Sequence, residues 1–388
     1  MFGMTFVIYK ALGPPKRGLL YTREDRSKWN DFIRTHSLGG VLTTLNVVGT
    51  LTSLAGCYVF LMGSSKLFGY FIFMCSVTLI PGAYITNLFS NRIMSSPRLQ
   101  LLLASPSQTG GVIAALFWAE DTASQRTTQL VKWVSILNLG AILWMEFTAF
   151  AAIGEHLLGL NSVLVAPILL FGCCLAVTLF TLKYGLRGFV FADLFHVPLI
   201  ALAALAILGG CIVLSYQSWG SMPSAKVILT PQLPIFACVL FAFHNVCLNG
   251  LQLLTTEGHW LRLWIFSQQE TKRLRLSTIL TGIVWGVLSL IGLLAFYLSN
   301  GIVGVPTIAG LLSRLNGLSI VFIAVFWIGG IAALFSTTDA ILYSLLIVWN
   351  YRPKEGVLHE HAMKNIRPWL IGPGIALFST AMYAILVQ

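Results

Sequence analysis

The chain has 388 residues, of which 57% are hydrophobic and only 10% are charged. A water-soluble domain carries about a quarter charged residues, so this composition excludes a soluble protein and indicates a chain surrounded by lipid. The net charge of +11 does not indicate nucleic-acid binding, because the basic residues lie in short segments between long apolar runs, as in membrane proteins generally.

The N-terminal segment 1–38 opens with the apolar run MFGMTFVIY, which is too short to cross a bilayer. We expect it to be the remnant of a preceding span, followed by a cytoplasmic segment from residue 10. No linker or low-complexity tract divides the rest of the chain, so residues 39–388 are predicted to form a single transmembrane domain.

Nine apolar runs follow, and each is long enough to cross the bilayer core as a helix of roughly 20 residues. Transmembrane strands would instead show about ten residues of alternating polarity. The sequence therefore predicts an all-α, polytopic membrane protein. The runs cover residues 39–63, 67–90, 133–154, 161–182, 188–214, 234–254, 276–298, 318–349 and 368–387.

Lysine and arginine are distributed unevenly over the loops between these runs. If segment 10–38 is cytoplasmic, the inside loops hold 21 of the 24 basic residues and the outside loops hold 3. Because basic residues concentrate in cytoplasmic loops, we expect this orientation, with Gln388 outside. The seven cysteines all lie inside apolar runs without ligand spacing, and we interpret them as small core residues.

Four segments, in chain order, resemble motifs of the sodium:solute symporter family. They are DFIRTHSLGG at 31–40, YGLRGFVFADLFH at 184–196, HWLRLWIFSQQETKRLR at 259–275 and IAALFSTTDAILYS at 331–344. The chain departs from the family pattern at Ala192, where the family has Thr, and at Leu261, where it has Gln. It also lacks a full preceding span and a tenth core span, so the resemblance implies a copy that is incomplete at both ends.

The resemblance implies a LeuT-like helix bundle of two inverted repeats with the binding site between them. The first repeat would cover residues 39–214, and the second, incomplete repeat residues 234–387. Discontinuous first and sixth helices would expose backbone carbonyls to a central cavity.

A sodium ion is the cofactor that the resemblance implies. Its ligands would be backbone oxygens of Gly49 and Thr52, the carbonyl of Ala333, and the hydroxyls of Ser336 and Thr337. The last three are spaced i, i+3 and i+4, so they share one helix face. Alternatively, such hydroxyls bond the carbonyl four residues back or pack between helices.

Two acidic residues within apolar runs are further candidates, because carboxylates inside a bilayer are costly and mark functional sites. Asp193 matches the aspartate of the family's fifth-span motif, and Asp339 follows Ser336 by three residues. We expect them to hold a second cation or a proton. Alternatively, Asp193 is a helix-start carboxylate at the cytoplasmic interface, paired with Lys183 or Arg187.

Polar residues in the third and sixth runs are candidates for contacting a solute. Glu146 lies in the middle of the third run, and a polar group lies in the sixth run, where the family's substrate-facing helix would unwind. Alternatively, these side chains make hydrogen bonds between helices. The sixth-run residues are His244, Asn245, Asn249 and Gln252.

These patterns predict a sodium-coupled symporter of a small organic solute, working by alternating access in the cell (plasma) membrane. The alternatives are a membrane-embedded solute-sensing module with a signalling partner, and a non-transporting homologue. An enzyme is not expected, because the sequence shows no phosphate-binding loop, dinucleotide-binding glycines or nucleophile elbow.

Overall fold

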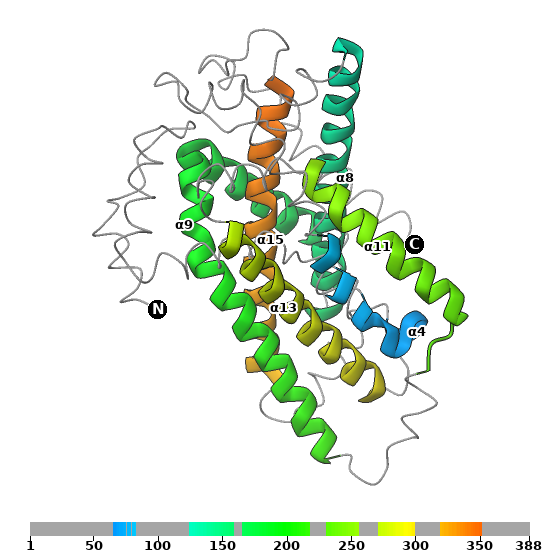
Figure 1. Cartoon of the computed structure of the whole chain (residues 1–388). Helices are drawn as coiled ribbons and strands as arrows, with labels where there is room; N and C mark the ends of the chain where they lie inside the picture. Colours follow the sequence, from blue (N-terminus) through cyan, green and yellow to red (C-terminus); the bar gives the residue numbers. More distant parts are fainter. Residues whose placement is uncertain are drawn as a thin grey trace.

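The computed structural model describes residues 65–82 apart from 75 and 79, and residues 124–158, 165–217, 230–255, 271–298 and 319–350. Within these ranges every regular element is helical, as the composition predicts. Four of the helices contain stretches long and apolar enough to cross a membrane (Figure 1). These stretches are Gln125–Phe150, Ala192–Gln217, Ile279–Leu298 and Ile320–Trp349.

Several helices coincide with predicted spans. Helix α11 (Ile235–Thr255), α13 (Thr271–Leu298) and α15 (Ser319–Asn350) each begin and end within five residues of an apolar run, and α8 (Gln125–Leu158) extends the third run at both ends. The agreement follows from chemistry: in lipid, backbone groups must be bonded internally, so a long apolar segment forms a helix. The predicted spans 39–63 and 368–387 lie outside the described residues.

The second predicted span, 67–90, does not form one regular helix. Helix α4 (Ser65–Phe68) gives way to a 3-10 turn, η2 (Gly69–Ile72), and residues 73–74, 76–78 and 80–82 are again helical. Gly69 has φ 49°, a conformation that only glycine adopts readily. A single left-handed residue thus interrupts an apolar run whose hydrophobicity gave no sign of a break.

The fourth and fifth predicted spans are joined in the structure. Helix α9 (Val165–Gln217) is continuous through residues 183–187, where we predicted a loop. It bends sharply at the left of Figure 1 rather than breaking. A Cβ at Gly188 would lie 2.6 Å from the Cβ of Tyr184 and 3.1 Å from the ring of Phe180, although four and eight residues of straight helix rise about 6 Å and about 12 Å. The missing Cβ of Gly188 lets the helix fold over this ring and keep its backbone hydrogen bonds.

Helix α15 lies at the centre and packs most extensively against α9 and then α8 (Figure 1). Lys132 of α8 donates a 3.0 Å hydrogen bond to the carbonyl of Trp349, near the C-terminus of α15. Near the other end of α15, the ring of Trp327 meets Phe150 edge to face, with centroids 5.4 Å apart. These two contacts show that α8 runs antiparallel to α15.

The C-terminal part of α9 also runs antiparallel to α15. Gly329 of α15 packs against Leu199 and Ala203, whereas Ser336 contacts Asp193, earlier in α9. Therefore α8 and this part of α9 run in the same direction. The N-terminal part of α9, which connects them along the chain, runs in the opposite direction. These relative directions are those that alternating spans require.

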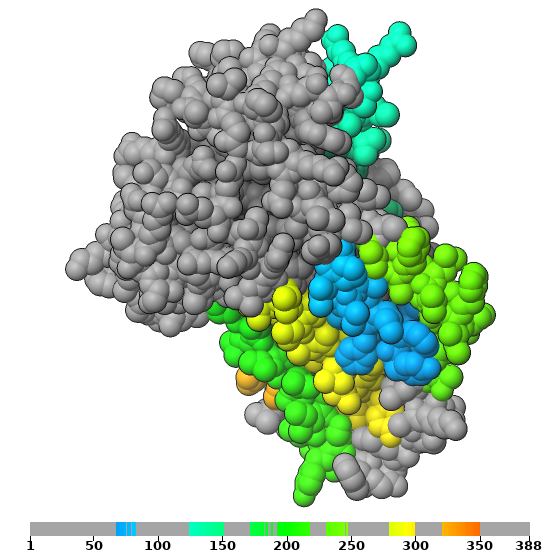
Figure 2. All heavy atoms as spheres, in the orientation of Figure 1, coloured from blue at the N-terminus to red at the C-terminus, as the bar shows by residue number. Residues whose placement is uncertain are grey.

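A second group of helices packs beside α9. Figure 2 shows α13, the α4 segment and α11 next to one another on the visible face. Phe68 stacks on Phe241 of α11 with ring centroids 4.2 Å apart, and Ser76 faces Ser289 of α13, with hydroxyl oxygens 3.5 Å apart. The candidate site lies on the other side of α9, against α15.

Candidate cation site between α9 and α15

A buried hydrogen bond joins α9 to α15 near the middle of α15. The Oγ of Ser336 donates to Oδ1 of Asp193 at 2.6 Å, and both side chains are fully buried. A hydroxyl that donates to a carboxylate makes a short, charge-assisted bond, stronger than one between neutral groups. This bond connects residues 143 positions apart, and it brings together two residues that the sequence motifs singled out separately.

The position of Asp193 corrects one interpretation of the sequence. Since α9 begins at Val165, Asp193 lies in the interior of a helix and is not a helix-start carboxylate. The Nζ of Lys183, one of the two proposed partners, lies over the ring of Tyr184, 5.0 Å from its centroid. Pro198, five residues further on, has no amide hydrogen to give to the carbonyl of Leu194, so it weakens the helix beside Asp193.

The hydroxyls of α15 fall into two kinds. Thr338 and Ser344 donate to the carbonyls four residues earlier, Leu334 at 2.6 Å and Ala340 at 2.7 Å, which is the ordinary behaviour of hydroxyls in apolar helices. Ser336 donates to a carboxylate of another helix instead. The Oγ1 of Thr337 is buried and has no hydrogen-bond partner among the described residues.

The structure places the other predicted ligand of α15 beside them. Ala333 is fully buried, one turn before Ser336 and Thr337. Asp339 is also buried, one turn after Ser336 on α15. The Ser336 hydroxyl therefore has one carboxylate bonded to it from α9 and a second one turn away on its own helix. Gly49 and Thr52, the predicted ligands from the first span, lie outside the described residues.

Glu146 is buried on the face of α8 that meets α15. Successive residues of an α-helix are rotated by about 100°, so Glu146 and Phe150, four residues apart, project from α8 within about 40° of each other. Phe150 contacts Trp327 of α15. Lys132 of α8 lies beside Trp349 of α15, and Phe150 lies beside Trp327. Interpolation between these two contacts along the antiparallel helices places Glu146 at about the depth of Ala333. Glu146 therefore lies at the same depth as the candidate cation ligands, on the opposite side of α15 from α9.

His196 is the neighbour that the sequence motifs did not single out. Its Nδ1 is 3.8 Å from Oδ1 of Asp193, and its ring lies 6.3 Å from that of Phe335. The signal was present in the sequence, since residues three apart share a helix face and His196 closes the motif segment 184–196. Because 3.8 Å is too long for a hydrogen bond, His196 flanks the Asp193 carboxylate without bonding it.

Of the polar group of the sixth run, the structure describes the side chain of His244 alone. His244 is exposed on α11, and α11 is a continuous helix through residues 244–252, so the expected unwinding does not occur there. The stretch contains one glycine, Gly250, and no proline, and an intact helix keeps its backbone groups bonded. Asn245, Asn249 and Gln252 belong to this helix, but their side chains lie outside the description.

The residues present suit a sodium ion. A hard cation takes oxygen ligands, and the site offers two adjacent hydroxyls beside a buried carboxylate. A buried hydroxyl without a partner costs about 1–3 kcal/mol, and a cation would give the Oγ1 of Thr337 the partner that it lacks among the residues that the structure describes. Among the described residues no group of three or more His, Cys, Asp or Glu side chains is arranged to hold a metal ion.

Comparison with known proteins adds no relative to this picture. No protein-family model matches the chain, and no curated protein is significantly similar to it. The resemblance to the sodium:solute symporters therefore rests on the four sequence motifs alone.

Proposed function

We propose that this protein is a sodium-coupled symporter of a small organic solute. The observation that supports the proposal most directly is the buried hydrogen bond from Ser336 to Asp193, beside the Thr337 hydroxyl, which has no hydrogen-bond partner in the described part of the chain. An apolar helix has no structural need for this arrangement, since Thr338 and Ser344 show how its hydroxyls are otherwise satisfied.

In this proposal the ion lies against α15, held by the hydroxyls of Ser336 and Thr337 and by the carbonyl of Ala333. Backbone oxygens of Gly49 and Thr52 complete its shell, and Asp193 supplies a nearby negative charge. At an effective dielectric constant of 20, a unit charge about 5 Å away contributes about 3 kcal/mol. Asp339 lies one turn away and would hold a second cation or a proton.

Coupling follows if the solute binds only when this site is filled. Glu146 lies at the depth of the cation ligands but on the opposite side of α15 from α9, so a solute contacting it would bind across α15 from the Ser336–Asp193 pair and would be coupled to the ion through that helix. The two repeats, 39–214 and 234–387, would then rock about the filled site to open it to either side of the membrane.

Sodium binding can be tested on the purified protein by thermal unfolding in sodium chloride and in potassium chloride of equal concentration. Sodium should stabilise the protein by about 2.7 kcal/mol at a hundredfold excess over its Kd, and potassium should not. The double variant Ser336→Ala/Thr337→Ala should lose the difference between the two salts. The matched control is Thr338→Val/Ser344→Ala on the same helix, which removes two hydroxyls bonded to backbone carbonyls and should retain it.

Two results would contradict the proposal: equal stability of the wild type in both salts, or a sodium effect that survives in the Ser336→Ala/Thr337→Ala variant. Transport itself is measured as movement of radioactive sodium into proteoliposomes, with a panel of organic solutes added. Sodium binding without any sodium movement would instead identify a sensing or non-transporting protein.

A further inference from the structure

The chemistry of the Ser336–Asp193 bond restricts where a cation can lie. A serine hydroxyl has one hydrogen and two lone pairs, and in this structure the hydrogen is directed at Oδ1 of Asp193. The lone pairs therefore point away from the carboxylate. An ion about 2.4 Å from the Ser336 oxygen, on the side of its lone pairs, would lie about 4 Å from Oδ1 of Asp193, beyond the distance at which that oxygen is a direct ligand.

The arrangement of α15 leads to the same conclusion. Ser336 lies within about 20° of Gly329, the residue that packs directly against α9, so Ser336 is on the face towards α9. Thr337 projects about 100° to one side of Ser336, and Phe335, which meets His196, about 100° to the other. An ion shared by Ser336 and Thr337 thus lies on the flank away from His196, and Ser336 stands between it and Asp193.

Taking the proposed sodium site as given, we infer that Asp193 is a positioning residue. It holds the hydroxyl hydrogen of Ser336, so that the lone pairs of that hydroxyl are already turned towards the ion before the ion arrives. Partners of this kind behind a ligand usually change metal affinity by about 10- to 100-fold. If Asp193 acts by orienting the Ser336 hydroxyl, its effect on sodium affinity requires a hydrogen-bond acceptor at residue 193 and disappears when Ser336 is removed. If Asp193 is a direct ligand, its effect on sodium affinity remains without Ser336.

The experiment compares two uncharged replacements of similar size. Asp193→Asn retains an acceptor oxygen for the Ser336 hydroxyl, whereas Asp193→Leu has none, so the loss of charge is common to both. Each is made with Ser336 present and in a Ser336→Ala background. The measurement is the sodium chloride concentration that gives half of the maximal thermal stabilisation, with ionic strength kept constant by potassium chloride.

With Ser336 present, Asp193→Leu should need about tenfold more sodium than Asp193→Asn. In the Ser336→Ala background the two variants should agree within about twofold, because the hydroxyl that Asn could orient is gone. The control is His196→Gln, because His196 lies beside Asp193 but makes no hydrogen bond to it. Its half-maximal sodium concentration should stay within about threefold of the wild-type value. If Asp193→Leu does not fold, Asp193→Ala takes its place.

Equal sodium requirements for the Asn and Leu variants with Ser336 present would overturn the inference, and would show that the carboxylate acts through its charge or as packing. An Asn–Leu difference that persists in Ser336→Ala would also overturn it, and would make residue 193 a direct ligand. If Ser336→Ala binds no sodium at all, the Asn–Leu pair is repeated in Ser336→Cys, whose thiol is only a weak donor. The difference should then shrink to within about twofold, and a difference that keeps its full size would overturn the inference and make residue 193 a direct ligand. Failure of the proposed function is a separate result, recognised by a wild-type protein that sodium does not stabilise.

Discussion

The crossing of α9 and α15 gives the sharpest test of the fold, through the substitution Gly329→Ala. A Cβ at Gly329 would collide with the Cβ of Ala203 and would lie 3.1 Å from the carbonyl oxygen of Leu199. Neither neighbour is the end of a flexible side chain, so the two helices must separate. Small residues at such crossings let membrane helices approach closely, and this approach supplies much of their association energy.

Forcing extra atoms into a packed contact costs about 1–3 kcal/mol. The matched control is Gly209→Ala on α9, where the added Cβ has no atom within 4 Å and should stabilise the helix by up to about 1 kcal/mol. Because the gain in helix propensity is common to both substitutions, we expect Gly329→Ala to be less stable than Gly209→Ala by about 1–3 kcal/mol. The measurement is thermal unfolding of both variants in the same detergent.

A second substitution checks the cause. Ala203→Gly removes the atom with which the new Cβ collides, so adding it to Gly329→Ala should recover part of the lost stability. Ser336 is seven residues from Gly329 on the same face of α15, about 10 Å along the axis. Separation of the helices should therefore also weaken sodium binding. A Gly329→Ala protein as stable as Gly209→Ala would refute this account of the crossing.

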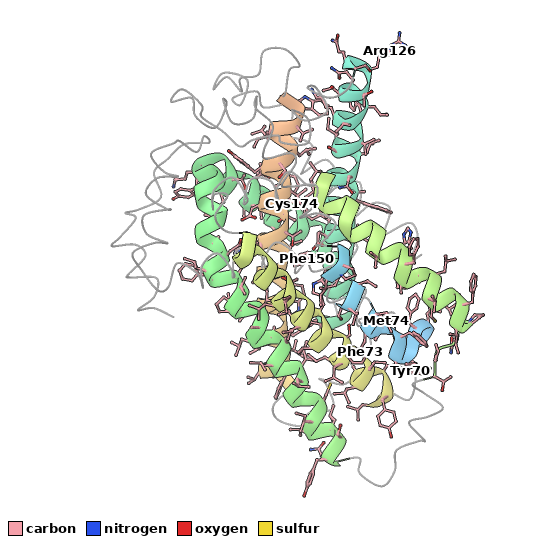
Figure 3. All side chains as sticks on the ribbon, viewed as in Figure 1. Tyr70, Phe73, Met74, Arg126, Phe150 and Cys174 are labelled. Carbon is pink, nitrogen blue, oxygen red and sulfur yellow. The ribbon has the colours of Figure 1, made fainter. Side chains whose placement is uncertain are left out.

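Two further predictions concern the contact between the start of α8 and the end of α15, and the topology. Lys132→Met removes the hydrogen bond to the carbonyl of Trp349 and should lower the stability by about 1–2 kcal/mol, whereas Arg126→Gln, at the exposed end of α8 (Figure 3), should leave the melting temperature unchanged. Cysteines introduced at Leu20 and Gln388 should react with an impermeant thiol reagent from opposite sides of the membrane. Labelling from the same side would rule out an odd number of crossings.

Helices α15 and α9 show best how much of the fold can be predicted from the sequence. The bounds of α15 follow from its sequence, because an uninterrupted apolar run must form a helix in lipid whatever surrounds it. For α9 the same reasoning failed. Lys183 and Arg187 indicated a loop, but the chain keeps its helical hydrogen bonds and bends over Phe180 at Gly188. Whether a polar interruption becomes a loop or a bend depends on space left by other side chains.

The candidate site shows the same division. From the sequence alone come the chemical types: hydroxyls at Ser336 and Thr337 on one helix and a carboxylate at Asp193 on another. Only the tertiary structure decided that Ser336 donates to Asp193, that Thr337 makes no hydrogen bond within the described residues, and that His196 stands beside the pair. Hydrophobicity and helical spacing are local properties that a sequence displays directly. A contact between residues 143 positions apart depends on where two helices cross, and here small residues at Gly329 and Ala203 set that crossing.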